Sequence, residues 1–333
     1  MDAPVLSLVL PLFNEEATIP ELDRRLRAFL ADVGSGVGES WEVIFVNDGS
    51  RDRSPALLKE LAKAEPRYKV LSLARNFGHQ MAITAGLDRA AGEAVVVMDA
   101  DLQDPPEVVR QMVAKWREGY DVVFGVRSRR HGESAFKKLT AALFYRLLRA
   151  MLGDVSIPVD AGDFRLMSRP VVLTLRALRE RHRFVRGLVW WVGFRQTAVT
   201  YERPGRFAGE TKYPLRRMLR FAIDGITSFS TVPLRMATWL GLLAGMVAIG
   251  GVGWALYSKF FGGVVRGWTT IMILVGLGSS AQLLMTGILG EYVGRIYEEV
   301  KRRPLYVVQD QINLPGPEAP RDARAPLPPP RRP

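Results

Sequence analysis

The chain has no cysteine and only three histidines among its 333 residues. Without cysteine it can form no disulfide, thiolate metal site or cysteine nucleophile, which agrees with a cytosolic location. Three histidines do not favour a zinc site. No Gly-x-Gly-x-x-Gly turn follows the first predicted strand, and no Gly-x-x-x-x-Gly-Lys-Ser/Thr loop is present. A dinucleotide oxidoreductase and a P-loop NTPase are therefore disfavoured.

Charged residues are absent from two long apolar segments, Met236–Tyr257 and Trp268–Gly290. At about 1.5 Å per residue, each would be roughly 33 Å long as a helix, which matches a hydrocarbon core of about 30 Å. A pair of buried core helices is the alternative. Because only a short loop separates the two segments, we predict a transmembrane hairpin with spans at about 234–257 and 268–291.

Basic residues, which give the chain a net charge of +12, gather beside these segments. The connecting loop holds only Lys259 and Arg266, whereas the outer flanks carry Arg216, Arg217, Arg220, Arg235, Arg295, Lys301, Arg302 and Arg303. The positive-inside rule then places the N-terminal domain and both termini on the cytoplasmic side of the membrane. Anionic lipids and phosphorylated substrates, rather than nucleic acid, are the expected partners. The first residues lack a basic region, so we expect no signal peptide.

The first 125 residues alternate strand and helix patterns. This alternation predicts an α/β fold with a mostly parallel sheet and helices on both faces. We expect strands at 5–12, 41–46, 69–73, 94–98 and 121–125, and helices at 18–30, 54–64 and 80–90. Three strands end in polar residues: Asn14-Glu15, Asn47-Asp48 and Asp99-Ala100-Asp101. Because parallel strands share one carboxyl edge, these residues are expected to line one crevice.

The Asp99-Ala100-Asp101 segment is a candidate metal site. Mg²⁺ is usually held by one or two carboxylates together with substrate phosphates, and Gln103 adds an amide oxygen nearby. Taken alone the pattern is weak, because acidic pairs at strand ends also occur as solvated loop residues. Gln103 could likewise be a surface residue.

Four motifs occur in a fixed order: Leu10-Pro11-Leu12-Phe13-Asn14-Glu15-Glu16, Val46-Asn47-Asp48-Gly49-Ser50, Asp99-Ala100-Asp101-Leu102-Gln103-Asp104-Pro105-Pro106-Glu107 and Gly162-Asp163-Phe164-Arg165-Leu166. With the two apolar segments behind them, the chain resembles the family 2 glycosyltransferases of the GT-A fold. Within that family it is similar to the polyprenyl-phosphate glycosyltransferases, which include bactoprenol glucosyltransferases and dolichol-phosphate mannose synthases. The resemblance covers residues 5–310 and implies a Rossmann-like GT-A domain in front of the hairpin.

The resemblance implies that the phosphate of a membrane-embedded polyprenyl phosphate attacks a nucleotide sugar. A divalent ion, Mg²⁺ or Mn²⁺, held by Asp99, Asp101 and Gln103 would neutralise the leaving diphosphate. The implied nucleotide-sugar-binding residues are Pro11, Asn14, Glu15, Asp48, Asp99 and Ala100. Two of them have simpler interpretations. Asp48-Gly49 could simply be a turn, since Asp favours turns for backbone reasons. Glu15 could be a charge that favours a helix N-terminus.

A catalytic carboxylate is implied near residue 163. Asp163 is our choice, Asp160 is the reserve, and Asp101 acts through the metal. A phosphate monoester has a second pKa of about 6, so the acceptor needs little help from a base. Asp163 therefore either accepts a proton or positions a substrate, and a structural pairing with Arg165 is the alternative.

Two basic loops are expected to bind the acceptor phosphate or the diphosphate, because arginine donates paired hydrogen bonds to phosphate. The candidate residues are Arg127, Arg130, Ser134, Arg203, Arg206, Lys212 and Tyr213. A solvated basic face is the alternative for both loops.

The predicted domains are a cytoplasmic catalytic domain at 1–230, two transmembrane helices within 231–295 and a basic, proline-rich tail at 296–333. Amphipathic helices near 135–152 and 213–227 would lie at the membrane surface or pack as ordinary core helices. A homo-oligomer is expected, with a tetramer among the forms that relatives adopt.

The expected function is inverting, metal-dependent sugar transfer from a nucleotide sugar, UDP-glucose first, to undecaprenyl phosphate. The product would be a polyprenyl-phosphate sugar, made on the cytoplasmic side of a bacterial-type inner membrane, that serves as a glycan precursor. Mannose and aminoarabinose transfer stay open. A processive polysaccharide synthase is disfavoured because no Gln-x-x-Arg-Trp motif is present. A non-catalytic membrane scaffold is the alternative from another class.

Overall fold

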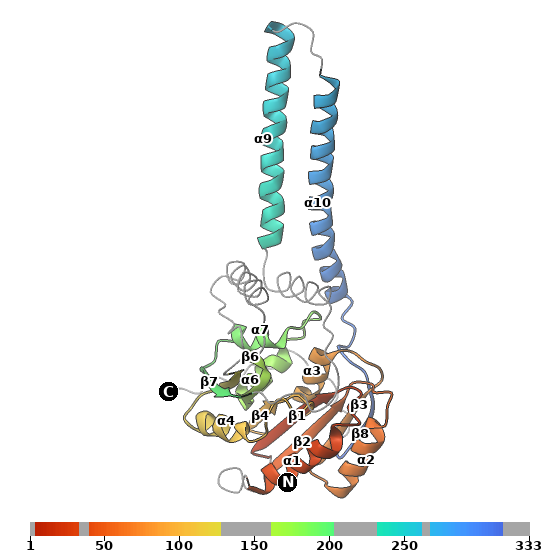
Figure 1. Ribbon diagram of the computed structural model, residues 1–333, viewed down its shortest axis with the longest axis vertical. Coiled ribbons are helices and arrows are strands. Elements are labelled where there is room, and N and C mark those ends of the chain that lie inside the picture. The colour runs from red at the N-terminus through yellow and green to blue at the C-terminus, as the bar shows by residue number, and fades with distance from the viewer. Residues whose placement is uncertain (1–3, 33–39, 128–160, 203–231, 262–266, 316–333) are drawn as a thin grey trace. The chain divides into compact units, whose positions relative to one another are not determined.

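Two separate units make up the chain, Met1–Pro214 together with Pro304–Pro333, and Leu215–Arg303. The computed structural model describes residues 4–32, 40–127, 161–202, 232–261 and 267–315. The first unit holds a β-sheet with covering helices, and the second holds two long helices (Figure 1). The first unit therefore includes residues that the sequence analysis assigned to the tail at 296–333.

The sheet of the first unit has eight strands in the order β7-β5-β6-β4-β1-β2-β3-β8. Their bounds are β1 (Leu6–Leu12), β2 (Trp41–Asn47), β3 (Tyr68–Leu73), β4 (Ala94–Val97), β5 (Val122–Arg127), β6 (Ala161–Ser168), β7 (Gln196–Tyr201) and β8 (Val308–Ile312). Parallel pairs join β1 to β2 and β4, β2 to β3, and β5 to β7. β6 is antiparallel to β4 and β5, and β8 is antiparallel to β3. The sheet is therefore mixed, and the five predicted strands are confirmed as β1 to β5.

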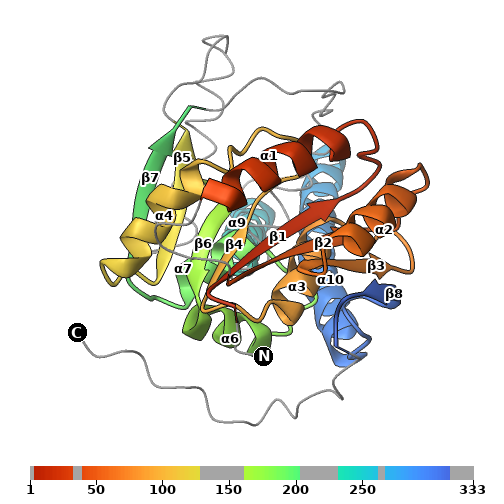
Figure 2. The same ribbon diagram turned by 90° about the horizontal axis from the view of Figure 1, so that it is seen from below.

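Helices cover both faces of the sheet (Figures 1 and 2). They are α1 (Ile19–Asp32), α2 (Ser54–Ala64), α3 (His79–Arg89), α4 (Val108–Arg117), α6 (Arg169–Ala177) and α7 (Val185–Trp191). Residues of α1, α2 and α4 share one buried cluster with alternate residues of the strands. α3 lies on the opposite face, where Gly86 approaches Val9 and Val46.

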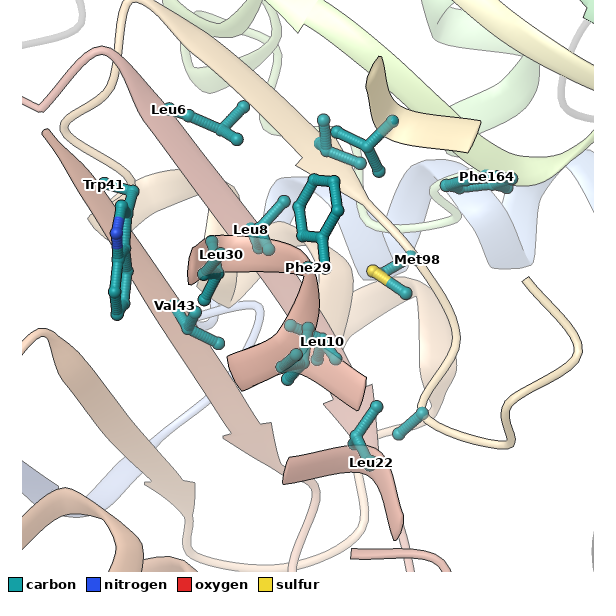
Figure 3. Packing of buried hydrophobic residues seen from close by; sticks show 14 of the residues in the cluster. Leu6, Leu8, Leu10, Leu22, Phe29, Leu30, Trp41, Val43, Met98 and Phe164 are labelled. Atoms are coloured by element: carbon teal, nitrogen blue, oxygen red, sulfur yellow. The ribbon is translucent and has the colours of Figure 1, made fainter. Parts of the chain in front are cut away.

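The central strands are buried along their whole length, as the burial of β1 and β2 shows. Such strands have apolar side chains on both faces because helices cover both sides of the sheet. On the face of α1, Leu8 and Leu10 of β1 lie with Leu22 and Phe29 of the helix (Figure 3). This packing fixes the strand ends that carry the polar motifs.

The inner strand β6 and the edge strands β7 and β8 were not predicted from the sequence. β6 carries the buried charges Asp163 and Arg165, so it lacks a continuous apolar pattern. β8, with the sequence Val-Gln-Asp-Gln-Ile, is a short and largely polar strand at the edge of the sheet. Short, polar strands are typical of sheet edges but resemble loops in sequence.

The segment after the second unit is anchored to the first unit by side chains as well as by β8. Tyr306 donates a hydrogen bond from its hydroxyl to Asp88, at 2.7 Å. The Asn313 amide donates to the carbonyl oxygens of Ala62 and Tyr68, at 2.7 and 2.8 Å. Residues 304–315 thus pack with the first unit.

The second unit consists of α9 (Val232–Phe261) and α10 (Trp268–Val300). The two helices are antiparallel neighbours, because Gly241 faces Met285 and Gly251 faces Leu274. Many of their large apolar side chains are exposed, among them Trp239, Ile249, Trp254, Phe260 and Leu283. Within the described part of the chain, no helix meets the combined requirements of length and hydropathy for a membrane span. The helices are observed, and their crossing of a membrane stays a prediction.

Candidate active site

The carboxyl ends of β1 and β2 are joined by reciprocal hydrogen bonds between the loops that follow them. The backbone N–H of Asn14 donates to the Ser50 hydroxyl at 3.0 Å, and the Arg51 N–H returns a bond to the Asn14 side-chain oxygen at 2.9 Å. The Glu15 N–H donates to the Ser54 hydroxyl at 3.0 Å. Asn14 has a φ of 56°, a conformation that asparagine tolerates better than most residues. The structure therefore brings two of the predicted loops together.

Asp48, the buried residue after β2, binds the backbone of the loop that follows β3. Its two carboxylate oxygens accept the N–H groups of Phe77 and Gly78, at 2.7 and 2.9 Å. Burial raises the pKa of Asp48, although these two hydrogen bonds oppose the shift. At Gly49, with a φ of 69°, a Cβ atom would lie 2.4 Å from the Arg75 carbonyl carbon, so the loops approach too closely for another residue.

The Asp99-Ala100-Asp101 segment follows β4 at the same edge of the sheet. The next residue, Leu102, has a buried side chain and a φ of 62°, which is unusual for leucine. The Gln103 N–H donates to the Asp101 carboxylate at 3.1 Å. Sparsely populated backbone conformations of this kind often occur at functional sites. The turn holds Asp101 and Gln103 close together.

Asp99 carries an unusual carboxylate. Burial raises its pKa to about 6, and the neighbouring His79 opposes the shift. Among the described residues, its buried Oδ1 atom accepts no hydrogen bond. The nearest ion-pair partner of that oxygen is the His79 Nε2 atom, at 3.5 Å. A buried oxygen without a hydrogen bond calls for another partner, such as a ligand or an ion.

Asp163, on β6, is buried and bound by three side chains. Arg186 of α7 donates two hydrogen bonds to its two oxygens, at 2.8 and 2.9 Å. The Gln80 amide lies 3.4 Å from Oδ2, and the His79 Nε2 atom lies 3.3 Å from the same oxygen. Burial alone would raise the pKa of Asp163, but Arg186 and His79 hold it well below its ordinary value. Asp163 is therefore ionised and a poor proton acceptor.

Arg165, two residues further along β6, is fully buried and donates to the Gly162 carbonyl oxygen at 2.7 Å. Burial lowers its pKa to about 10, and the Asp163 charge opposes the shift. Arg186 rather than Arg165 makes the hydrogen bonds to Asp163. The pairing of Asp163 with Arg165 that the sequence left open is thus replaced by the Arg186 pair.

Three site residues escaped the sequence analysis: His79, Gln80 and Arg186. Each is a polar residue within the first two positions of a helix, α3 or α7. The available signal was the position of His79 and Gln80 after the β3 strand, at the same sheet edge as the other polar motifs. Arg186 had no comparable signal, because α7 was not predicted.

Several predicted residues lie outside the described residues, so their placement stays a prediction: Asp160, Arg130, Ser134, Arg203, Arg206, Lys212 and Tyr213, with the helices near 135–152 and 213–227. Arg127 is the last residue of β5. Pro11 lies within β1, paired with Val46 of β2, and Ala100 is buried in the turn after β4.

The donor atoms at the Asp99-Asp101 turn fit a hard divalent cation. They are carboxylate and amide oxygens, and one of them, Asp99 Oδ1, is buried without a hydrogen bond among the described residues. Within the same residues, no group of three or more histidine, aspartate or glutamate side chains is arranged to hold a metal. A site with two carboxylates suits an ion that takes its other ligands from phosphates and water.

Comparison with known proteins gives concordant results. The model of glycosyl transferase family 2 matches residues 7–175. The uncharacterized glycosyltransferase YkcC of Bacillus subtilis (strain 168) is 50% identical over 309 residues, which cover 92% of this chain and 94% of that protein. The prophage bactoprenol glucosyl transferase homolog of Escherichia coli (strain K12) is 40% identical over 305 residues, 91% of this chain and 98% of that protein.

Similarity to solved structures is weaker. The mannosyltransferase PcManGT from Pyrobaculum calidifontis, in complex with GDP-Man and Mn²⁺, aligns with a TM-score of 0.40 and 18% identity, over 86% of this chain and 88% of that one. This likeness is too low to carry an inference about the site.

Proposed function

This chain belongs to glycosyl transferase family 2, and from that premise we propose that it transfers glucose from UDP-glucose to a polyprenyl phosphate at the cytoplasmic face of a membrane. It is a glycosyltransferase. The choice of glucose and of a polyprenyl acceptor rests on the similarity to the bactoprenol glucosyl transferase homolog and on the sequence motifs. The acidic turn at Asp99 and Asp101, with Asp163 close by, is the observation that carries the proposal.

The donor would bind over the loops after β1, β2 and β4. Asp99 and Asp101, assisted by Gln103, would hold Mg²⁺ or Mn²⁺. The ion would act as a Lewis acid that stabilises the departing diphosphate. Asp48 shapes this site through the backbone of Phe77 and Gly78. Any contact between Asp48 and the nucleotide must use the lone pairs that these two bonds leave available.

The role proposed for Asp163 is electrostatic positioning. Its oxygens are engaged by Arg186, and its pKa is well below the ordinary value, so it has little tendency to take a proton. The acceptor phosphate is already largely ionised at neutral pH, since its second pKa is about 6. A single displacement by that phosphate would invert the anomeric configuration.

The second unit supplies the proposed membrane attachment. Large side chains of α9 and α10 are exposed, including Trp254 at 71% and Phe261 at 79% of their accessible surface. Contiguous exposed apolar surface is costly in water and marks contact with a protein or a membrane. The basic flanks of these helices favour a cytoplasmic catalytic unit. Attachment would bring the site to the lipid phosphate.

The test measures how fast the Asp101→Ala variant transfers labelled glucose from UDP-glucose to undecaprenyl phosphate. Loss of a metal ligand should reduce transfer by about 100-fold or more, because the ion contributes several kcal/mol to stabilising the developing charge. The control is Asp310→Ala, at an exposed residue of β8 whose carboxylate accepts the Gln311 N–H. Activity of Asp101→Ala equal to that of Asp310→Ala at matched metal would refute the metal-ligand assignment.

A further inference from the structure

His79 lies between two carboxylates of the site, the buried Asp163 and the partly buried Asp99. Its Nε2 atom is 3.3 Å from Asp163 Oδ2 and 3.5 Å from Asp99 Oδ1. The three residues come from different elements: His79 begins α3, Asp99 follows β4 and Asp163 is on β6. Two neighbouring carboxylates would repel each other without a cation or hydrogen-bond donor between them.

The fold builds this position of His79 from the side of β2. Asp48 accepts the N–H groups of Phe77 and Gly78, the two residues that directly precede His79. Gly78 has a φ of 97°, which only glycine adopts readily. The turn before α3 is therefore fixed by a buried carboxylate and by a backbone conformation that other residues disfavour.

Gln80 fixes the same helix end from the side of α7. Its Oε1 atom accepts the Val185 N–H at 2.9 Å, and its amide group approaches Asp163. Arg186, the next residue of α7, donates hydrogen bonds to both oxygens of Asp163. The contacts of its two chain neighbours, Gly78 and Gln80, thus fix the position of His79 between Asp99 and Asp163.

We propose that His79 is a positioning residue whose imidazole, 3.3 Å from Asp163 and 3.5 Å from Asp99, keeps the two carboxylates in a fixed relation by electrostatic attraction, so that Asp99 presents an oxygen to the donor's metal ion while Asp163 stays beside the reacting groups. The proposal rests on the proposed function and extends it. Partners that orient a metal-ligating side chain typically change metal affinity or activity by about 10- to 100-fold when they are lost. His79 would be such a partner without being a ligand itself.

Three substitutions separate this role from simple filling of space. In His79→Gln the side-chain amide nitrogen lies near the position of Nε2, so a donor is kept within reach of both carboxylates. In His79→Asn the donor lies near the position of Nδ1 and falls short of them. His79→Leu keeps bulk and has no donor. The measurements are binding of Mn²⁺ in the presence of UDP, followed by electron paramagnetic resonance of the free ion, and the separate kcat and KM for transfer.

The expected result is that His79→Gln stays within about threefold of the wild type, while His79→Asn and His79→Leu bind Mn²⁺ with UDP about 10- to 100-fold more weakly and show reduced kcat. Thermal unfolding midpoints should agree among the three variants, which would show that weaker Mn²⁺ binding does not come from a fold defect. Equal Mn²⁺ binding by all four proteins would overturn the role of His79, as would equal losses in Gln and Leu. A wild type that binds no Mn²⁺ with UDP would instead refute the proposed function, and the role of His79 would fall with it.

Discussion

Among single residues of the site, buried charges are matched by partners from distant parts of the chain. Asp163 of β6 is paired with Arg186 of α7, and Asp48 after β2 accepts backbone N–H groups from the loop after β3. Such pairing is necessary, because a buried charge without a partner destabilises the fold by several kcal/mol. The site therefore depends on residues that the sequence does not place together.

Arg186→Leu should lower the free energy of unfolding by about 1.5–3 kcal/mol, since hydrogen bonds to a charged group are worth that much and Asp163 would be left buried without its pair. The control is Arg24→Leu, which removes an exposed ion pair with Glu21. Exposed ion pairs are worth at most about 1 kcal/mol, so this control should be nearly neutral. Chemical denaturation of both variants tests the difference, and equal losses would contradict the pairing.

The lowered pKa of Asp163 also predicts that stability depends on pH. Because Arg186 and His79 hold the pKa of the folded state below its ordinary value, the carboxylate stabilises the fold fully above the unfolded pKa of about 3.9 and loses this effect as the pH falls further. The difference in unfolding free energy between the wild type and Asp163→Asn should therefore shrink as the pH falls from about 4 to 3. A difference that grows on acidification would contradict a lowered pKa of Asp163 in the folded state.

The sequence predicted part of this site. Asn14, Asp48, Asp99 and Asp101 were predictable because each directly follows an apolar strand of a parallel sheet, and such strand ends share one edge. Arg186 was not, because its pairing depends on an antiparallel β6 and on α7, for which the sequence offered no periodic pattern. Asp48 was expected to contact a nucleotide, and the structure adds a role in holding a loop.

Between elements, close approach of a helix to the sheet fixes the geometry at the site. α3 begins with His79, and seven residues later Gly86 lies against β1. A Cβ atom built on Gly86 would lie 2.2 Å from Val9 Cγ1. The helix can therefore lie this close to the sheet only with glycine at that position.

Gly86→Ala should destabilise the protein by about 1–3 kcal/mol through overpacking against Val9. The loss should be smaller in a Val9→Ala background, because removing the Val9 Cγ atoms makes room for the new methyl group. Unfolding free energies of the two single variants and the double variant test this coupling. Additive losses would mean that the contact between α3 and β1 is not the cause.

Of the three strands that the sequence missed, β7 and β8 lie at the edges of the sheet and β6 lies between β4 and β5. β1 to β5 were predictable from apolar strands alternating with helices. β8 was not, since its polar sequence follows a long helix and its pairing with β3 joins residues far apart in the chain. Edge strands are stabilised by backbone pairing and by contacts such as Asn313 with Ala62 and Tyr68, which no local pattern reveals.

Across the whole chain, a catalytic unit with a polar site is joined to a pair of long helices with exposed apolar side chains. The chain passes from the first unit into the second and returns to the first at Pro304. The catalytic unit is thus connected at both ends of the helical pair.

Membrane contact is tested with single-tryptophan variants in lipid vesicles. Trp254 of α9 is 71% exposed, whereas Trp41 of β2 is 8% exposed and lies in the core of the catalytic unit. In vesicles that contain brominated lipids, fluorescence of a variant retaining only Trp254 should be strongly quenched. A variant retaining only Trp41 should be unaffected. Equal quenching, or none for Trp254, would contradict membrane contact by α9.

The central claim is sugar transfer from a nucleotide sugar to a lipid phosphate, and the most direct measurement is a donor panel. Purified full-length protein is incubated with Mg²⁺, undecaprenyl phosphate and, in separate reactions, radiolabelled UDP-glucose, UDP-galactose, UDP-N-acetylglucosamine and GDP-mannose. We predict that label from UDP-glucose enters the organic phase and that removal of the metal abolishes this transfer. Folded protein that moves label from none of these donors into lipid would contradict it.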